Sequence, residues 1–174
     1  MLNNEMQDAL NQQINIEFNS AYSYLALAAY FEAIHLKGFA HWMRIHYLEE
    51  RMHANKIFDF IIDRDGRVEL LGLAKPRLEW SSPLEAFEWA LETEVSNSES
   101  IYKLAELAMA KHDYATHTFM QWFISEQVEE EAIVNDMVAK LRLVGDSNAA
   151  LFLMDQELGQ RPMPEEADLQ GDSD

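Results

Sequence analysis

The sequence of 174 residues contains no cysteine, which excludes disulfide bonds and any metal site built from thiolates. Glycine and proline are scarce, with 6 and 4 residues, and none of them interrupts a long periodic segment. No apolar run approaches the length of a membrane span. These absences favour one globular domain, in which any metal must be bound through oxygen and nitrogen.

Positive charge is also in short supply, because 13 basic residues stand against 31 acidic ones and give a net charge of −18. This balance argues against binding nucleic acid, whose phosphates need Lys and Arg. It is compatible with attracting cations, although a solvated acidic surface would give the same charge. The first ten residues lack the basic start and apolar stretch of a signal peptide, so we expect a cytoplasmic protein that makes no membrane contact.

Apolar residues recur at helical spacing along most of the chain, which predicts an all-α protein. We expect four long helices and a short fifth one, over approximately residues 4–33, 39–64, 83–110, 115–144 and 147–158. Ser82 is the expected N-cap of the third helix, with Pro83 at its first position and Glu85 near its positive end. Breaks are expected at Gly38, Asp65-Gly66 and Gly145.

The lengths of the connections predict how these helices pack. Short loops after the first and third helices make each pair antiparallel. The middle link of roughly 17 residues can reach about 55 Å, whereas a helix of about 27 residues is about 40 Å long. The sequence therefore predicts a four-helix bundle with one long crossover, occupying residues 1–158. The acidic tail, residues 159–174, has little to bury and is expected to be disordered.

The apolar seam of each helix, followed in alternating steps of three and four residues, is interrupted near its middle. Similar helix lengths place these interruptions at one height of the bundle, where Tyr24 lies on the same face as the first of them. The interrupting residues are Glu17, Glu50, His53, Glu94, Gln127 and Glu130.

Four carboxylates buried together would repel one another and lose their hydration, and no Lys or Arg lies on any seam to neutralise them. They must either be protonated or surround a cation. Glu50 and His53 are three residues apart, as in the Glu-x-x-His motif of di-iron bundles, and oxygen-rich donors suit iron or manganese better than zinc. A misread seam would instead leave these side chains exposed. His46, on the same seam, is expected to be a hydrogen-bonded core histidine, with a ligand role as the alternative.

As a set, these residues resemble those of the ferritins. The resemblance rests on Glu17, Tyr24, Glu50-x-x-His53, Glu94 and Gln127-x-x-Glu130, together with the crossover and the short fifth helix. It is strongest to the bacterial non-haem ferritins, because "SEQVEEE" supplies Glu126, Gln127, Glu129 and Glu130 together. The resemblance implies a ferritin-like fold, an octahedral shell of twenty-four subunits, oxidation of Fe(II) by dioxygen or hydrogen peroxide, and storage of ferric mineral.

The resemblance also implies a role for each residue of the set. Glu17, Glu50 and His53 would hold a first iron, and Glu50 would bridge to a second iron held by Glu94 and Glu130. Gln127 would lie beside the pair and help to place the oxidant, and Tyr24 would form a hydrogen bond near the centre. A third iron site, formed by Glu49, Glu126 and Glu129 and sharing Glu130, would tune the supply of electrons and the passage of iron towards the mineral.

Three other functions remain as alternatives. A haem-bearing bacterioferritin would use a methionine as axial ligand, but Arg51 stands where that family places it, and Met52 is turned by about 100° around the helix. A rubrerythrin-like di-iron oxidase or peroxidase would carry a second Glu-x-x-His where this chain has Gln127-x-x-Glu130. A cation buffer without redox chemistry is the third. We therefore expect iron as the cofactor and no haem.

Overall fold

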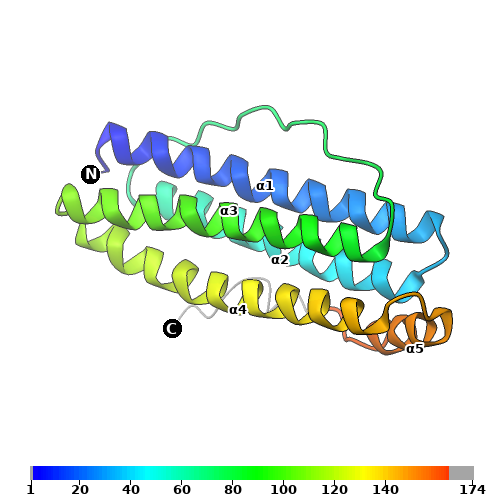
Figure 1. The fold of residues 1–174 in the computed structure, drawn as a ribbon. Helices are drawn as coiled ribbons and strands as arrows, with labels where there is room; N and C mark the ends of the chain where they lie inside the picture. Colours follow the sequence, from blue (N-terminus) through cyan, green and yellow to red (C-terminus); the bar gives the residue numbers. More distant parts are fainter. Residues whose placement is uncertain (1, 165–174) are drawn as a thin grey trace.

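The computed structural model describes residues 2–164 and has five helices and no strand in this range, which confirms the predicted all-α fold (Figure 1). The helices run, in order, over Asn4–Ala33 (α1), Lys37–Asp63 (α2), Pro83–Ala110 (α3), Tyr114–Val144 (α4) and Asn148–Leu158 (α5). The four long helices lie side by side, and α5 packs at one end of the bundle (Figure 1).

The long link between α2 and α3 runs along the outside of α1 over most of the bundle length (Figure 1). Amide side chains spaced four residues apart on α1 bind its backbone. Asn11 accepts a hydrogen bond from Glu69 N and donates one to Arg67 O, and Asn19 accepts one from Ala74 N. Gln7 and Asn15 extend the row, through bonds to Arg67 N and Gly72 O. These contacts hold an irregular segment in place by satisfying backbone groups that it cannot pair internally.

Helix starts follow the capping chemistry of the sequence. Ser82 accepts a hydrogen bond from Glu85 N with Pro83 at the first helical position, as predicted. Asn3, Asp113 and Ser147 cap α1, α4 and α5 in the same way. Each cap satisfies one of the backbone N–H groups that a helix leaves free at its start.

The predicted breaks at Asp65-Gly66 and Gly145 are confirmed, but the break at Gly38 is not. Gly38 lies inside the first turn of α2, not at the end of α1. After α1, α2 and α3, one residue in each turn adopts the left-handed backbone conformation. These residues are His35, Asp65 and His112, with φ of 64°, 55° and 55°. Glycine tolerates this region best, but short polar residues also adopt it at helix ends. Gly38 is needed for a different reason, since its Cα faces the backbone of α5.

The core consists of two apolar clusters with a polar layer between them. One cluster, at the end of the bundle that carries α5, includes Phe31, Phe39 and Phe87. The other, at the opposite end, includes Leu10 and Ile57. The seams are thus apolar at both ends, as predicted, and the bundle has two hydrophobic halves that fix the height of the residues between them.

Within residues 2–164, no helix is long and apolar enough to cross a membrane. The domain boundary at residue 158 stays a prediction. Of the tail, the structure describes residues 159–164, and residues 165–174, to which the prediction of disorder mainly applies, lie outside the described residues.

Candidate metal centre

The residues that interrupt the four seams are buried together between the two apolar clusters. None of the six is more than 6% exposed: Glu17, Glu50, His53, Glu94, Gln127 and Glu130. No Lys or Arg is buried anywhere in residues 2–164. The bundle therefore places four carboxylates and an imidazole in its interior without a buried Lys or Arg beside them.

Three of these side chains, Glu17, Glu50 and His53, come close enough to share one cation, with their candidate ligand atoms all within 4.8 Å of one another. His53 Nδ1 lies 3.7 Å from Glu50 Oε2 and 3.9 Å from Glu17 Oε2. His53 Nδ1 and Glu50 Oε2 are buried and have no hydrogen-bond partner. Buried polar atoms rarely stay unpaired, so these atoms fit a site completed by a metal ion.

Polar residues from α1 and α3 hold Glu17 in place. Gln13 Nε2 donates to Glu17 Oε1 at 2.7 Å and to Asn97 Oδ1 at 2.7 Å, and Asn97 Nδ2 donates to Glu17 Oε2 at 3.2 Å. Ser100 Oγ donates to Gln13 Oε1. Outer partners of this kind orient metal ligands. The seam pattern did not identify Gln13 or Asn97, although the buried Asn97 lies one position before a seam residue.

Glu94 is held by Tyr24 and Gln127. The Tyr24 hydroxyl donates to Glu94 Oε1, in line with the expected hydrogen bond near the centre. Gln127 Nε2 lies 3.3 Å from Glu94 Oε2 and 3.2 Å from Ser98 Oγ, and it donates to both. The NH₂ group of Gln127 therefore points towards Glu94, and this hydrogen bond fixes the orientation of the Glu94 carboxylate.

A second group of possible ligands consists of His46, Glu49 and Glu130. His46 is buried; its ring stacks on Tyr24 and contacts the tilted ring of Trp42, with ring centroids 5.2 and 3.8 Å away. Its Nδ1 lies 3.1 Å from Glu130 Oε2 and 3.3 Å from Glu49 Oε2, but not in hydrogen-bonding geometry. His46 is thus a buried histidine whose Nε2 has a hydrogen-bond partner in Arg161, as expected. Its Nδ1 also has the surroundings of a potential ligand, which was the alternative left open by the sequence.

The remaining residues of the expected third iron site are less closely placed. Within residues 2–164, the groups able to share one ion include Glu49 and Glu130 but neither Glu126 nor Glu129. Burial raises the pKa of Glu126. The charges of Glu129, Glu130 and Glu49 raise it further, so Glu126 is close enough to these carboxylates to be repelled by them. The third site as expected from the sequence stays a prediction, and so does the absence of haem at the partly exposed Met52.

The ionisation of the carboxylates shows what burial costs. Burial, and then the charges of Glu94 and Glu17, raise the pKa of Glu50 well above its usual range. Burial raises the pKa of Glu94 to about 7, although the hydrogen bond from Tyr24 opposes the rise. Burial also tends to raise the pKa of Glu130, but the neighbouring imidazole of His46 and the charges of His53 and Arg161 together outweigh it, and the pKa is lowered. Without metal, Glu50 and Glu94 favour their protonated forms, and a bound cation would take the place of those protons.

The raised pKa of Glu94 predicts a pH-dependent stability for the metal-free protein. Between pH 4.5, the usual pKa, and about 7, the unfolded chain ionises Glu94 while the folded chain keeps its proton. Stability is therefore fully present below this window and is lost as the pH rises through it. We expect the thermal midpoint of chelator-treated protein to fall on the order of 5 °C between pH 5 and pH 8.

The matched pair Glu94→Gln and Glu92→Gln identifies the group responsible. Glu94→Gln should reduce the dependence, since an amide does not ionise, while the raised pKa of Glu50 keeps part of it. Calorimetry at several pH values measures this. Glu92 is exposed on the same helix, so Glu92→Gln should leave the slope as it is. An unchanged slope in Glu94→Gln would contradict the assignment.

Comparisons with known proteins agree with this geometry. A family model described as a ferritin-like domain matches residues 7–144. A bacterial non-heme ferritin of Staphylococcus aureus strain MRSA252 is 39% identical over 166 residues, covering 95% of this chain and all of the relative. One from Staphylococcus saprophyticus is 41% identical over 165 residues, covering 95% and 99%.

Solved structures show the same likeness. A ferritin of the archaeon Archaeoglobus fulgidus, engineered into a closed form, superposes with a TM-score of 0.93 at 50% identity, covering 94% of this chain and all of that one. The open-pore ferritin from the same archaeon superposes with a TM-score of 0.92 at 50% identity, covering 93% and 100%.

Proposed function

The chain belongs to the ferritin family, and from this premise we propose that it oxidises Fe(II) at a di-iron centre inside each subunit and stores the ferric product in a hollow shell of twenty-four copies. Iron storage accords with the bacterial non-heme ferritins among its relatives. The observation that carries the oxidation step is the buried set of carboxylates with unpartnered atoms, among which residues 2–164 place no buried Lys or Arg.

In this proposal each residue acts as its position suggests. Glu17, Glu50 and His53 bind one Fe(II), and Glu50 also reaches the second, which Glu94 and Glu130 bind. Burial and neighbouring charge raise the pKa values of Glu50 and Glu94, so arrival of the cations displaces protons from these carboxyls. Two Fe(II) ions give two electrons, which with two protons reduce dioxygen to hydrogen peroxide or reduce peroxide to water.

Gln127 and Tyr24 have positioning roles, because both hold Glu94 by hydrogen bonds. The apolar clusters on either side exclude bulk water from the centre. A third iron position at Glu49, Glu126 and Glu129, and a cytoplasmic location, belong to the same proposal.

The proposal is tested by mixing iron-free protein with Fe(II) in air and following ferric absorbance by stopped flow. A fast phase of about two irons per subunit, followed by slower uptake into a very large particle, is the expected result. Gel filtration with iron analysis measures the size of the particle and the amount of iron that it takes up. A monomer or dimer that keeps only two irons would indicate a di-iron enzyme, and iron bound without oxidation would indicate a cation buffer. Because the archaeal relatives include open-pore and closed forms, electron microscopy of the particle would also show which type of shell it forms.

A further inference from the structure

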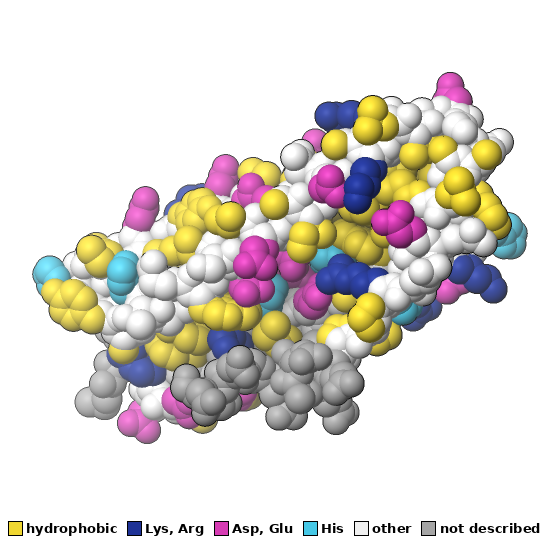
Figure 2. All heavy atoms as spheres, turned by 90° about the horizontal axis from the view of Figure 1, so that it is seen from below, with side chains coloured by type: hydrophobic (Ala, Val, Ile, Leu, Met, Phe, Trp, Pro, Cys, Tyr) yellow, Lys and Arg dark blue, Asp and Glu magenta, His cyan; other side chains and the backbone are white. Residues whose placement is uncertain are grey.

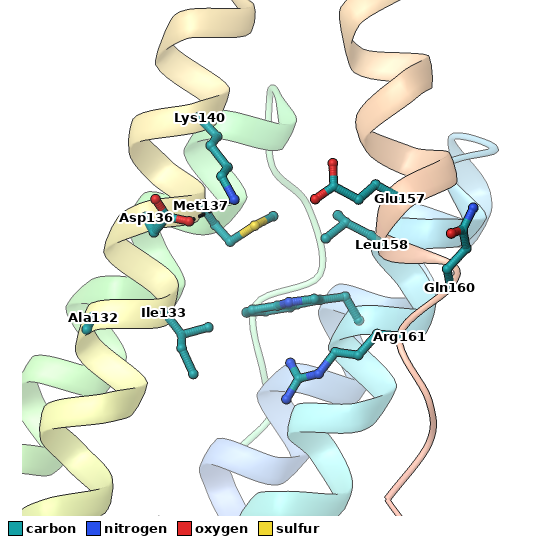
Figure 3. Close-up of a pocket in the computed structure, with 10 residues that line it drawn as sticks. Ala132, Ile133, Asp136, Met137, Lys140, Glu157, Leu158, Gln160 and Arg161 are labelled. Carbon is teal, nitrogen blue, oxygen red and sulfur yellow. Dashed lines mark ion pairs between the residues drawn. The ribbon is translucent and has the colours of Figure 1, made fainter.

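Arg161, in the segment after α5, lies against the second group of possible ligands. Its Nη1 is 3.2 Å from His46 Nε2, and its Nη2 is 3.2 Å from Glu49 Oε1. Its carbonyl oxygen is 2.6 Å from Nε2 of His41. The chain beyond α5 is therefore held on α2 at two points, and the guanidinium points into the space between α2 and α4 (Figure 3).

A pocket of about 590 Å³ opens beside this guanidinium, between α2, α4 and α5. Trp42, Ile133, Met137 and Leu158 form much of its wall, and Arg161 lies at its edge (Figure 3). From below, this face of the molecule shows a hollow lined with hydrophobic side chains, with acidic, basic and histidine side chains gathered close to it (Figure 2). The guanidinium has room to leave its partners, and an ion has room to approach them.

On the inner side of Arg161, three buried atoms face one another without hydrogen-bond partners. They are His46 Nδ1, Glu49 Oε2 and Glu130 Oε2. The two oxygens lie 3.3 and 3.1 Å from the nitrogen. The Arg161 contacts use the other atoms of the same groups, His46 Nε2 and Glu49 Oε1, and so leave this inner set free. One imidazole nitrogen and two carboxylate oxygens suit a divalent transition-metal ion with further positions open to water.

The hydrogen bond from Arg161 determines whether His46 can bind such an ion. A guanidinium carries only donors, so His46 Nε2 must accept and the ring hydrogen must sit on Nδ1. A protonated Nδ1 has no lone pair for a metal. An ion bound at Nδ1 would move the hydrogen to Nε2 through water, with no net release of protons, and Nε2–H would then point at the donors of Arg161. The hydrogen bond and the metal bond therefore exclude each other.

We propose that His46, Glu49 and Glu130 form a divalent-cation site that opens only when Arg161 leaves His46. Such an ion would lie next to Arg161, which lines the surface pocket, and it would share Glu130 with the proposed iron centre. Because Glu130 belongs to both sites, this cation site would regulate the iron centre of the proposed function, on which it rests. Zn²⁺ is not oxidised, so binding of Zn²⁺ tests the site whether or not the protein oxidises iron.

The test is a series of crystals of the assembled protein soaked at increasing Zn²⁺ concentrations, with occupancy at each site measured by anomalous diffraction. In the unaltered protein, a Zn²⁺ ion should bind at His46 Nδ1, and Arg161 should have left Nε2 wherever the ion is present. Arg161→Met removes the competing donor, and half-occupancy should be reached at about tenfold lower Zn²⁺. Arg161 lies outside the helices, so the bundle is expected to fold unchanged.

Arg142→Met is the matched control, because it removes an arginine from an exposed ion pair with Glu88 and so changes the net charge equally. It should leave the Zn²⁺ dependence at His46 as it is. Three results would overturn the proposal: Zn²⁺ at Nδ1 with Arg161 still bonded to Nε2, equal half-occupancy in Arg161→Met and the unaltered protein, or no Zn²⁺ at these residues in either crystal.

Discussion

Glu50→Ala is expected to abolish the fast phase of Fe(II) oxidation, with the initial rate lowered by at least about 100-fold. Loss of outer partners of metal ligands already costs about 10- to 100-fold, so loss of a direct ligand should cost more. Burial raises the pKa of Glu50, and the charges of Glu94 and Glu17 raise it further, so Glu50 interacts with a carboxylate of each proposed iron position. Its removal would therefore weaken both positions at once.

Stopped-flow absorbance of the variant, mixed with two Fe(II) per subunit in air, measures this effect. Glu106→Ala is a matched control, since Glu106 is an exposed glutamate on α3 away from the polar layer. It should oxidise iron at the unaltered rate. Circular dichroism should show the same helix content in both variants, because the two apolar clusters are untouched. A fast phase that survives Glu50→Ala would show that oxidation occurs elsewhere.

Gly38→Ala is expected to release α5 from the bundle. An added Cβ would lie 1.6 Å from the carbonyl oxygen of Asp155 and 2.6 Å from its carbon, which are backbone atoms of α5. Neither can turn away as a side chain could, so the helix must move as a whole. The movement would also break the bond from Phe39 N to Asp155 Oδ1. We expect a cost of about 3 kcal/mol to the docking of α5.

Limited proteolysis of the segment around Gly145 and α5 measures this cost, and cleavage should be about 100-fold faster in the variant. Gly72→Ala is the matched control, because a Cβ at Gly72 meets nothing within 4 Å. The fast oxidation of iron should persist in both variants, since α1 to α4 supply the proposed centre. Equal cleavage rates in the two variants would show that α5 is not held by this close approach.

The helices were predictable from the sequence because their signals are local. Ser82, Pro83 and Glu85 determine a helix start within four residues, and the structure confirms it. The turns were less predictable. Glycine was expected at the end of α1, but His35 takes the left-handed conformation there, and Gly38 serves a contact with α5 that lies 117 positions further along the chain. A sequence shows where a glycine is, but not whether backbone conformation or close packing requires it.

Contacts between segments that are distant in the chain produce weaker patterns in the sequence. The row of Gln7, Asn11, Asn15 and Asn19 has a spacing of four residues, which places the amides on one face of α1. That pattern could have indicated a polar partner, and the partner is the backbone of the crossover. Gln13 and Asn97 show no comparable pattern in the sequence, because each is a single amide. The role of each depends on its hydrogen bond to Glu17, which lies on the same helix as Gln13 and on a different helix from Asn97.

The sequence by itself determined the helices, the crossover and the residues that interrupt the seams, because periodicity and loop length are properties of the chain read in order. Only the tertiary structure decided which atoms of those residues remain unpaired and which are held. His46 shows the difference: its seam position follows from local spacing, but its Nε2 contact comes from Arg161, 115 residues away. No local pattern encodes that contact, since it exists only after α5 has docked on α2 and turned the chain back along it.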